Sequence, residues 1–468
     1  MMQYKYSIIN RWRSTARQLL WLFILLCSLI LTNQELDNTN LMGKPGEGYY
    51  MKVEIGTPPQ TFNVLVDTGS TNFAIAAAPN PNVETFFISS SSSTYLSHYK
   101  KVSVLYTQGF WDGELGSDVL YFPSLNTPQV RCDVAAIQTS HNFYMNGSQW
   151  QGILGLAYTV IARPDRNVVS WLEALQHARN NQSVVFSLEL CGSPNDENRH
   201  TGVFEVLDNK PEETELLTAP IVREWFYELL LLGISVGDQV VDLPCRKFNT
   251  DKTILDSGTT SLRLPSEVFS EVVRLLNSSI TQQSVPVSDD FWMLQKMFCW
   301  KDPLDWMHFP NISLSLFHSD NSYFVLELPP QSYIRKVSDK SEALGLQNCY
   351  KFSIESSNTG TVLGVVVMEG FRIVFNRSSK TVGFAKSHCG PSVNLFGPVT
   401  TKTDMRSCMN PIPVPNVSAL TVAAYVIAAL MSVCGMLLVY FLCQWLWETY
   451  IKQKLYMSAS ESSLISDD

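Results

Sequence analysis

The sequence predicts an all-β fold made of two related halves, followed by one C-terminal transmembrane helix. The first observation is a series of short apolar runs separated by turn residues, which is typical of strands. The clearest runs are Tyr49–Ile55, Thr61–Val66, Val184–Leu190, Phe226–Leu232 and Phe371–Phe375. The second is a pattern that occurs twice, and the third is a long uncharged segment near the C-terminus. Helical periodicity is rare, and Val168–Arg179 and Pro265–Leu276 are the best candidates for helices.

The composition is that of a folded protein with an apolar excess. The chain has 468 residues, of which 16% are charged and 45% are hydrophobic, and this balance excludes a disordered polyelectrolyte. The formal net charge of −9 argues against a nucleic-acid partner, because nucleic-acid-binding proteins carry a basic surface. We therefore expect a globular protein whose apolar excess lies in a few segments.

An apolar run near the N-terminus, Leu19–Leu31, has the layout of a secretory signal peptide. Arg11, Arg13 and Arg17 precede the run, and polar residues follow it. The run is shorter than the roughly 20 residues that a membrane-spanning helix needs. We therefore expect a signal peptide over residues 1–32. The alternative is an uncleaved signal anchor, because the basic leader is long.

A second apolar segment, Ala419–Leu442, carries no charge and is long enough to cross the hydrocarbon core of a membrane. The Lys and Arg residues near its two ends are balanced in number and do not decide its orientation. The signal peptide decides it, and the sequence predicts a type I single-pass membrane protein. In the C-terminal tail, Glu461–Ile465 is similar to an acidic dileucine signal for endosomal sorting.

Cysteines and sequons agree with passage through the secretory pathway. Seven of the ten cysteines lie between the signal peptide and the membrane segment. An oxidising compartment favours disulfides, and an odd number allows at most three bridges within one chain, which spacing alone does not assign. Exposed Asn-x-Ser sequons are glycosylation candidates: Asn146, Asn181, Asn277, Asn311 and Asn416. A sixth, Asn376, lies in a strand-like stretch and is the least suitable.

The pattern that occurs twice is an apolar strand that ends in an aspartate. Val64–Thr71 reads VLVDTGST, and Thr253–Thr260 reads TILDSGTT. Each copy is followed by a matching apolar segment with a glycine, Gly152–Leu156 in the first half and Thr361–Val365 in the second. The two halves are therefore related, and each offers one carboxylate on a tight turn.

Two facing carboxylates suit the water-mediated hydrolysis of an amide bond. Asp67 and Asp256 cannot both ionise at close range, so we expect them to share one proton. The ionised member takes a proton from a water molecule, and the protonated member donates to the scissile carbonyl oxygen. Glycine permits the tight turn, and hydroxyl groups can orient the pair. The supporting residues are Thr68, Gly69, Ser70, Ser257, Gly258 and Thr259.

In these residues the chain resembles the pepsin-like aspartic endopeptidases, and among them the membrane-anchored β-secretase (memapsin) type. The resemblance covers about residues 43–409, and the single membrane segment continues it. The matching motifs are Asp67–Ala74, Tyr106–Gly109, Ile153–Ala157, Ile161–Asp165, Arg223–Tyr227, Asp256–Thr260 and Arg263–Pro265. The resemblance implies a bilobal, pepsin-like double β-barrel with a few short helices and a substrate cleft between the lobes.

The resemblance also implies roles for residues outside the aspartate turns. Tyr106, Thr107 and Gln108 match the flap, a β-hairpin that closes over the bound peptide. Trp111 matches a tryptophan that supports the flap. Arg263 matches an arginine that lines substrate pockets, and a guanidinium group would favour an acidic or polar substrate side chain.

The family's disulfides carry over as Cys191–Cys389, Cys245–Cys408 and Cys299–Cys349. Cys132 is left over, either as a buried free thiol or as half of an intermolecular bridge. The chain departs from the family pattern in three places. Only a short segment, residues 33–42, precedes the protease region where the family has a longer prosegment. In addition, Thr201–Leu207 replaces a glycine-rich strand, and Asn376–Arg377 stands where Asp-Arg is common.

Other hydrolase classes are poorly supported. Gly233–Gly237 fits the Gly-x-Ser-x-Gly motif of serine hydrolases, but that motif requires a helix after it, and Asp238–Pro244 reads as another strand. The histidines show no His-Glu-x-x-His spacing of a metalloprotease. We expect neither a metal nor a cofactor.

The sequence therefore predicts a membrane-anchored aspartic endopeptidase that cleaves the ectodomains of single-pass membrane proteins and resides in the Golgi, endosomes and cell surface. The alternatives are a protease-like binding ectodomain without catalysis and a soluble secreted protease. The predicted order is a signal peptide (1–32), a short linker or propeptide (33–42), an N-terminal lobe (43–217), a C-terminal lobe (218–409), a stalk (410–418), a transmembrane helix (419–442) and a cytoplasmic tail (443–468).

Overall fold

The computed structural model describes residues 39–44, 46, 48–106, 109–145, 147–192, 200–207, 216–281, 287–302, 304–337, 348–402, 404–410 and 419–464. The chain divides into a first unit that ends at Asn410 and a second that begins at Pro411, and each is described by itself. The predicted signal peptide and most of the linker lie outside the described residues. Thr107, Gln108 and the sequons Asn146 and Asn416 also lie outside them.

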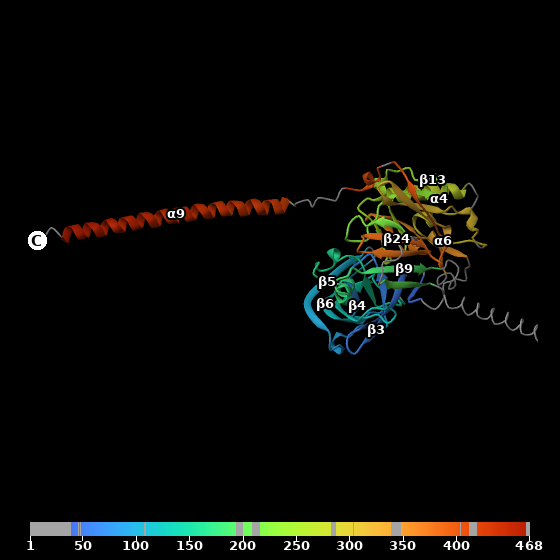
Figure 1. The fold of residues 1–468 in the computed structure, drawn as a ribbon, viewed down its shortest axis with the longest axis horizontal. Helices are drawn as coiled ribbons and strands as arrows, with labels where there is room; N and C mark the ends of the chain where they lie inside the picture. The colour runs from blue at the N-terminus through green and yellow to red at the C-terminus, as the bar shows by residue number, and fades with distance from the viewer. Residues whose placement is uncertain are drawn as a thin grey trace, which may run out of the picture. The chain divides into compact units, whose positions relative to one another are not determined.

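The first unit is built almost entirely from β-sheets (Figure 1). Its largest sheet has 13 described strands. In spatial order they are β11 (Leu217–Pro220), β24 (Thr381–Lys386), β23 (Phe371–Asn376), β9 (Val185–Cys191), β10 (Thr201–Leu207), β1 (Leu41–Lys44), β2 (Gly48–Ile55), β3 (Gln60–Asp67), β8 (Gly152–Gly155), β4 (Phe73–Ala76), β7 (Val130–His141), β6 (Gly109–Tyr121) and β5 (Leu96–Tyr106).

Three smaller sheets form the rest of the C-terminal half. The first contains β13 (Gln239–Val240), β12 (Leu231–Val236), β17 (Ile312–Ser319), β18 (Ser322–Leu328) and β25 (Asn394–Thr400). The second contains β14 (Thr253–Leu255), β22 (Thr361–Leu363), β15 (Leu262–Pro265) and β21 (Ile354–Ser357). The third contains β16 (Phe298–Cys299), β20 (Cys349–Phe352) and β19 (Ile334–Lys336).

Short helices fill the connections between the strands. They are α2 (Trp171–Ala178), α3 (Cys245–Phe248), α4 (Ser266–Thr281), α5 (Asp289–Met293), α6 (Pro330–Tyr333) and α8 (Val365–Met368), with 3-10 turns η2 (Ser89–Ser91), η3 (Thr159–Ile161), η6 (Trp306–His308) and η7 (Met405–Cys408). Both predicted helices are present. Helix α2 begins at Trp171 because Ser170 caps it, accepting a hydrogen bond from the Glu173 amide at 3.3 Å.

The predicted all-β, pepsin-like fold is confirmed, and four of the five predicted strands are present. The prediction for Phe226–Leu232 is wrong over most of its length, because β12 begins only at Leu231. Tyr227 and Leu229 are buried, but the backbone before β12 makes only isolated bridges, such as Glu228 with Ile254. The run of apolar residues therefore indicates that this segment is buried, but most of the segment does not pair as a strand.

The two predicted lobes share a sheet. Strand β23 from the C-terminal half pairs with β9 from the N-terminal half, and β24 and β11 follow it. Figure 1 labels β9 and β24 of this group. Phe186 of β9 stacks on Phe375 of β23 with ring centroids 4.7 Å apart. Thr201–Leu207 forms β10 within this sheet, and Asn376 caps a turn through the amides of Ser378 and Ser379. The predicted boundary between residues 217 and 218 falls within β11.

A buried charged cluster also joins the two halves. Glu369, which follows α8, is completely buried. Its carboxylate pairs with Arg335 of β19 and accepts a hydrogen bond from the Tyr49 hydroxyl at 2.7 Å. His200 Nε2 lies 3.3 Å from the same carboxylate. Burial alone would raise the pKa of Glu369, but the charge of Arg335 and the bonds from His200 and Tyr49 lower it to about 2.

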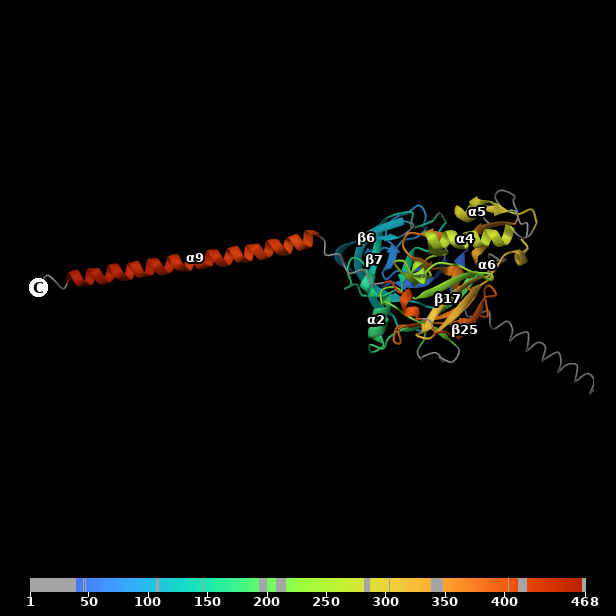
Figure 2. The same cartoon turned by 90° about the horizontal axis from the view of Figure 1, so that it is seen from above.

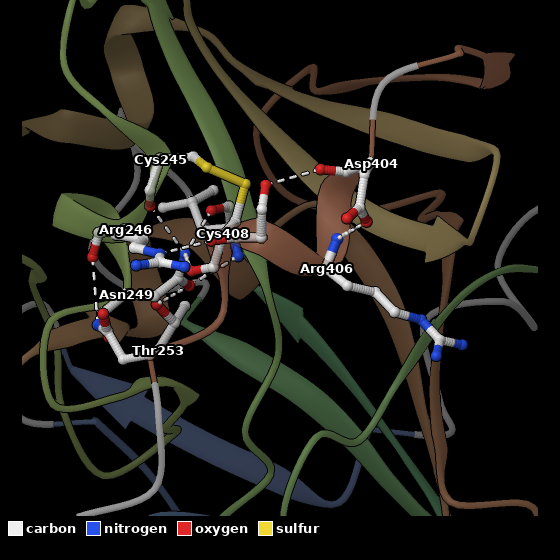
Figure 3. The surroundings of a disulfide bond; sticks show 10 residues. Cys245, Arg246, Asn249, Thr253, Asp404, Arg406 and Cys408 are labelled. Atoms are coloured by element: carbon white, nitrogen blue, oxygen red, sulfur yellow. Dashed lines mark hydrogen bonds between the residues drawn. A yellow bond between two sulfur atoms is a disulfide. The ribbon is translucent and has the colours of Figure 1, made fainter.

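Three disulfides cross-link the first unit, with the pairing that the family resemblance implies. Cys245–Cys408 joins α3 to η7 close to Asn410, where the unit ends (Figure 3). Asn249 donates from Nδ2 to the Cys245 carbonyl at 3.0 Å and accepts from the Thr253 hydroxyl at 2.8 Å. Thr253 begins β14, so this cluster connects the end of the unit to the strand before Asp256.

The remaining cysteine and the sequons differ in exposure. Cys132 is a buried free thiol, and burial raises its pKa well above the usual range, which argues against an intermolecular bridge in the folded protein. Asn181 is exposed, whereas Asn277 and Asn311 are half-buried. Asn376 is buried with its side chain engaged in the turn. Among the described sequons, Asn181 is the most accessible.

The second unit contains the single long helix α9 (Ala419–Leu464), drawn in both ribbon views (Figures 1 and 2). The segment Ala423–Met457 is long and apolar enough to cross a membrane. The helix continues beyond Leu442, where the predicted span ends, because no Pro or Gly interrupts residues 443–464. The side chains of the proposed sorting motif lie outside the described part of the chain.

Candidate active site

Both predicted aspartates lie where a buried core strand meets a turn. Asp67 is the last residue of β3, and Asp256 directly follows β14. Strand β3 pairs in parallel with β8, and β14 pairs in parallel with β22. The duplicated motif thus has the same local topology in the two halves.

Each turn supplies two hydrogen bonds to its own carboxylate. The Gly69 amide donates to Asp67 Oδ1 at 2.7 Å, and the Ser70 hydroxyl donates to Asp67 Oδ2. In the other turn, the Gly258 amide donates to Asp256 Oδ1 at 2.9 Å. Thr259 Oγ1 donates to Asp256 Oδ2 at 2.8 Å. Both carboxylates are therefore fixed in orientation by equivalent donors.

Thr68 and Ser257 brace the two turns against each other instead of touching the carboxylates. The Thr68 hydroxyl donates to the Leu255 carbonyl at 3.0 Å and accepts from the Ser257 amide at 2.9 Å. In the reverse direction, the Ser257 hydroxyl donates to the Val66 carbonyl at 2.7 Å and accepts from the Thr68 amide at 3.0 Å. Both side chains are buried, so these four reciprocal bonds hold the turns in fixed register.

The two glycines allow each turn to approach the opposite aspartate. A methyl group added at Gly69 would lie 2.4 Å from the Asp256 carboxylate. One added at Gly258 would lie 2.4 Å from Asp67 Oδ1. These distances are below van der Waals contact, so both positions require glycine for the carboxylates to come together.

Electrostatics favour one shared proton in this site. Burial raises the pKa of Asp67 well above its usual range, and the negative charge of Asp256 raises it further. Hydrogen bonds from Ser70 and Gly69 oppose this rise without cancelling it. A buried pair of this kind cannot keep both carboxylates ionised.

Tyr106 lies at the end of β5, in an antiparallel hairpin with β6. The Trp111 indole donates a hydrogen bond to the Tyr106 hydroxyl at 3.4 Å. The Tyr106 ring stacks on Phe143, with the ring centroids 5.4 Å apart. Burial raises the pKa of Tyr106, and the charge of Asp67 adds to the effect. This places the tyrosine within electrostatic reach of the aspartate pair. Trp111 is the support that the resemblance implies, whereas Phe143 was not expected, because no motif marks it.

Arg263 does not stand alone. Its Nε lies 3.4 Å from Oε2 of Glu355, and the two side chains are 11% and 28% exposed, respectively. Glu355 was also missed, because the strand that carries it shows no recognisable motif. Within the described part of the chain, no group of three or more His, Cys, Asp and Glu side chains could hold a metal ion.

Comparison with known proteins agrees with this geometry. The family model described as eukaryotic aspartyl protease matches residues 48–387. A β-secretase of Strongylocentrotus purpuratus is 38% identical over 445 residues, which cover 86% of this chain and 81% of that protein. Gastricsins of Rattus norvegicus and Suncus murinus are 25% and 24% identical over 343 and 349 residues, covering 72% of this chain and 81% of each gastricsin. The chain belongs to the eukaryotic aspartyl protease family and is an aspartic-type endopeptidase similar to β-secretase.

Proposed function

We propose that Asp67 and Asp256 form the catalytic dyad of this endopeptidase. The observation that carries the proposal is the reciprocal bracing of the two turns by Thr68 and Ser257. This bracing holds two equivalent carboxylates in a fixed relation, which general acid–base chemistry requires. It also argues against a binding ectodomain that has lost catalysis.

The proposed reaction has no covalent intermediate. The ionised aspartate takes a proton from a water molecule between the carboxylates, and the water oxygen attacks the scissile carbonyl carbon. The protonated aspartate donates its proton to the carbonyl oxygen, which gives a tetrahedral diol. The aspartate that took the proton from water then donates it to the amide nitrogen, the C–N bond breaks, and one hydroxyl of the diol returns its proton to the other aspartate as the carboxylic acid forms. Tyr106 would close over the peptide and exclude bulk water while this occurs.

The pH dependence of peptide cleavage should be bell-shaped, because only the singly protonated dyad is competent. Activity should fall as pH rises through the raised pKa of Asp67, since the proton that the carbonyl oxygen needs is then lost. It should also fall at low pH, when both carboxylates are protonated. The measurement is kcat/KM against pH for one reference peptide. A rate that rises steadily to pH 8 would contradict the dyad mechanism.

We further propose that the enzyme is anchored in a membrane by α9, with the catalytic unit on the luminal side, and that it cleaves other single-pass membrane proteins. The support is the apolar segment Ala423–Met457 and the signal-peptide pattern at the N-terminus. Confining enzyme and substrate to one bilayer raises their effective concentration, so weak affinity for the peptide can suffice. Passage through the Golgi and endosomes would expose the dyad to acidic pH.

One cleavage segment presented in two formats tests this proposal. The segment is fused to a single-pass membrane anchor or secreted as a soluble protein, and each form is co-expressed with the full-length enzyme. We expect the anchored form to be cleaved at least about tenfold more efficiently. Cells that express an Asp256→Asn enzyme give the background. Equal cleavage of both formats would overturn the proposed preference for membrane-bound substrates and leave the dyad untouched.

A further inference from the structure

The four-stranded sheet that leads to Asp256 has one apolar face and one mixed face. The apolar face packs into the main core and comprises Leu255, Leu262, Leu264, Ile354 and Leu363. The mixed face carries a row of registered neighbours. Ile254 pairs with Val362, Val362 pairs with Arg263, and Arg263 pairs with Glu355. The row therefore ends in a charged pair.

The charged pair lies on the face of the sheet that carries Ile254, because side chains alternate along a strand and Val362 and Arg263 are the registered neighbours that connect Ile254 to Glu355. Strand β14 ends at Leu255, and Asp256 follows directly, two residues after Ile254. Neighbouring strands are about 4.8 Å apart, so β15 lies about 10 Å from β14 across the sheet. An extended peptide advances about 3.4 Å per residue. Arg263 and Glu355 can therefore meet a substrate side chain two or three residues from the scissile bond.

The two charges compensate each other inside the protein. Arg263 is the more buried partner and Glu355 the more open one, so a substrate side chain that approaches Arg263 also meets the carboxylate. Their separation of 3.4 Å leaves the pair close to neutral overall. In the pair Arg274–Glu271 on α4 the side chains are 62% and 25% exposed, respectively, so the cation of this pair is open to water and salt, unlike Arg263.

We propose that Glu355 determines the charge preference of this pocket and that the Arg263–Glu355 pair selects a neutral, hydrogen-bonding substrate side chain over a carboxylate. The inference rests on the proposed function of the aspartate dyad. A substrate carboxylate must compete with Glu355 for Arg263 and lies beside a like charge. A substrate amide has no such conflict, because its oxygen accepts from the guanidinium group and its nitrogen donates to Glu355. This narrows the expectation that Arg263 favours an acidic or polar substrate side chain to the polar, uncharged ones.

Matched peptides test the proposal on the full-length enzyme. Each peptide places Asn or Asp at one position, and the position is moved along the peptide on both sides of the scissile bond. Rates are measured near pH 5, where a peptide aspartate, with a pKa of about 3.9, is ionised. At one position we expect wild-type kcat/KM to favour Asn over Asp. Glu355→Gln should shift that ratio toward Asp by about tenfold or more, with no change at the other positions.

Two further variants separate a pocket effect from a general one. Glu271→Gln removes the carboxylate of the exposed ion pair on α4, and its Asn-to-Asp ratios should equal those of the wild type. The double variant Arg263→Gln/Glu355→Gln should lose the gain in Asp cleavage, because no cation remains. Thermal unfolding of each variant shows whether the fold is kept.

The outcomes separate this inference from the function on which it rests. If Glu355→Gln cleaves peptides with unchanged ratios at every position, the role of Glu355 is overturned and the dyad stands. If Glu355→Gln does not fold, the wild-type ratios decide alone, and a preference for Asp over Asn at that pocket position overturns the inference. If Asp256→Asn still cleaves the peptides, the dyad itself is wrong.

Discussion

Asp256→Asn is expected to lower kcat/KM for peptide cleavage by a factor on the order of 10⁴ or more. Asparagine has nearly the size of aspartate and can keep the bond from the Gly258 amide. It can neither take a proton from water nor share one with Asp67. The dyad acts as a unit, so Asp67→Asn should cause a loss of the same order. Single-turnover cleavage of a fluorescent peptide at acidic pH measures both variants.

A matched Asp→Asn change at an exposed site is the control. Asp320 is 62% exposed and pairs with Arg406 on the surface, so Asp320→Asn should keep wild-type activity. Cleavage by Asp256→Asn at more than a few per cent of the wild-type rate would contradict the proposed mechanism.

The Asp→Asn variants of the dyad should lose activity without unfolding. The pKa of Asp67 is raised in the folded state, so the unfolded chain releases this proton at lower pH than the folded chain. The free energy of unfolding therefore falls as pH rises from about 4 through the raised value. Asp67→Asn removes this penalty, and its unfolding midpoint at neutral pH should exceed that of the wild type.

Glu369→Gln is expected to lower the free energy of unfolding by about 3–5 kcal/mol, because it leaves Arg335 without its partner in a buried site. Glu369 is completely buried, and the residues that contact its carboxylate are Tyr49 of β2, Arg335 of β19 and His200, which directly precedes β10. Urea-induced unfolding at neutral pH measures the loss. Glu271→Gln on the surface of α4 is the matched control, and it should cost less than about 1 kcal/mol.

The pH dependence of the Glu369 effect has a defined sign. The folded pKa of about 2 lies below the usual carboxyl value of 4.5. The stabilisation is therefore complete above about pH 4.5 and is lost as pH falls toward 2. The difference between wild type and Glu369→Gln should shrink over that interval. A constant difference from pH 7 to pH 2 would show that the charge of Glu369 is not its source.

The sequence predicts the aspartate turns well, because every residue that holds a carboxylate lies within three positions of it. Gly69, Ser70, Gly258 and Thr259 all bond to their own aspartate. The sequence predicts that the Thr68 hydroxyl braces and orients the carboxylate pair, but it does not identify the partners of this hydroxyl. Its partners belong to the other turn, and only the folded chain brings them together.

Contacts between residues that are far apart in the sequence could not be predicted for the same reason. Tyr49 and Glu369 are 320 positions apart, and neither belongs to a pattern that marks the other. Glu355 lies opposite Arg263 only because β15 and β21 pair in parallel register. The run Phe226–Leu232 shows that an apolar run does not always form a strand, since its apolar residues are buried but β12 begins only at Leu231.

The Cys245–Cys408 disulfide also affects how the first unit resists a pulling force on its C-terminal end. Cys408 lies two residues before Asn410, and the Asn410 side chain bonds to the Asn249 carbonyl at 2.6 Å. Tension applied to the chain beyond Asn410 would first load these hydrogen bonds. A covalent link then passes the load to α3, so the final turn η7 cannot peel away by itself. In a protease pulled by a membrane-embedded tether, the load would therefore enter the unit at α3 and Asn249, beside the strand that precedes Asp256.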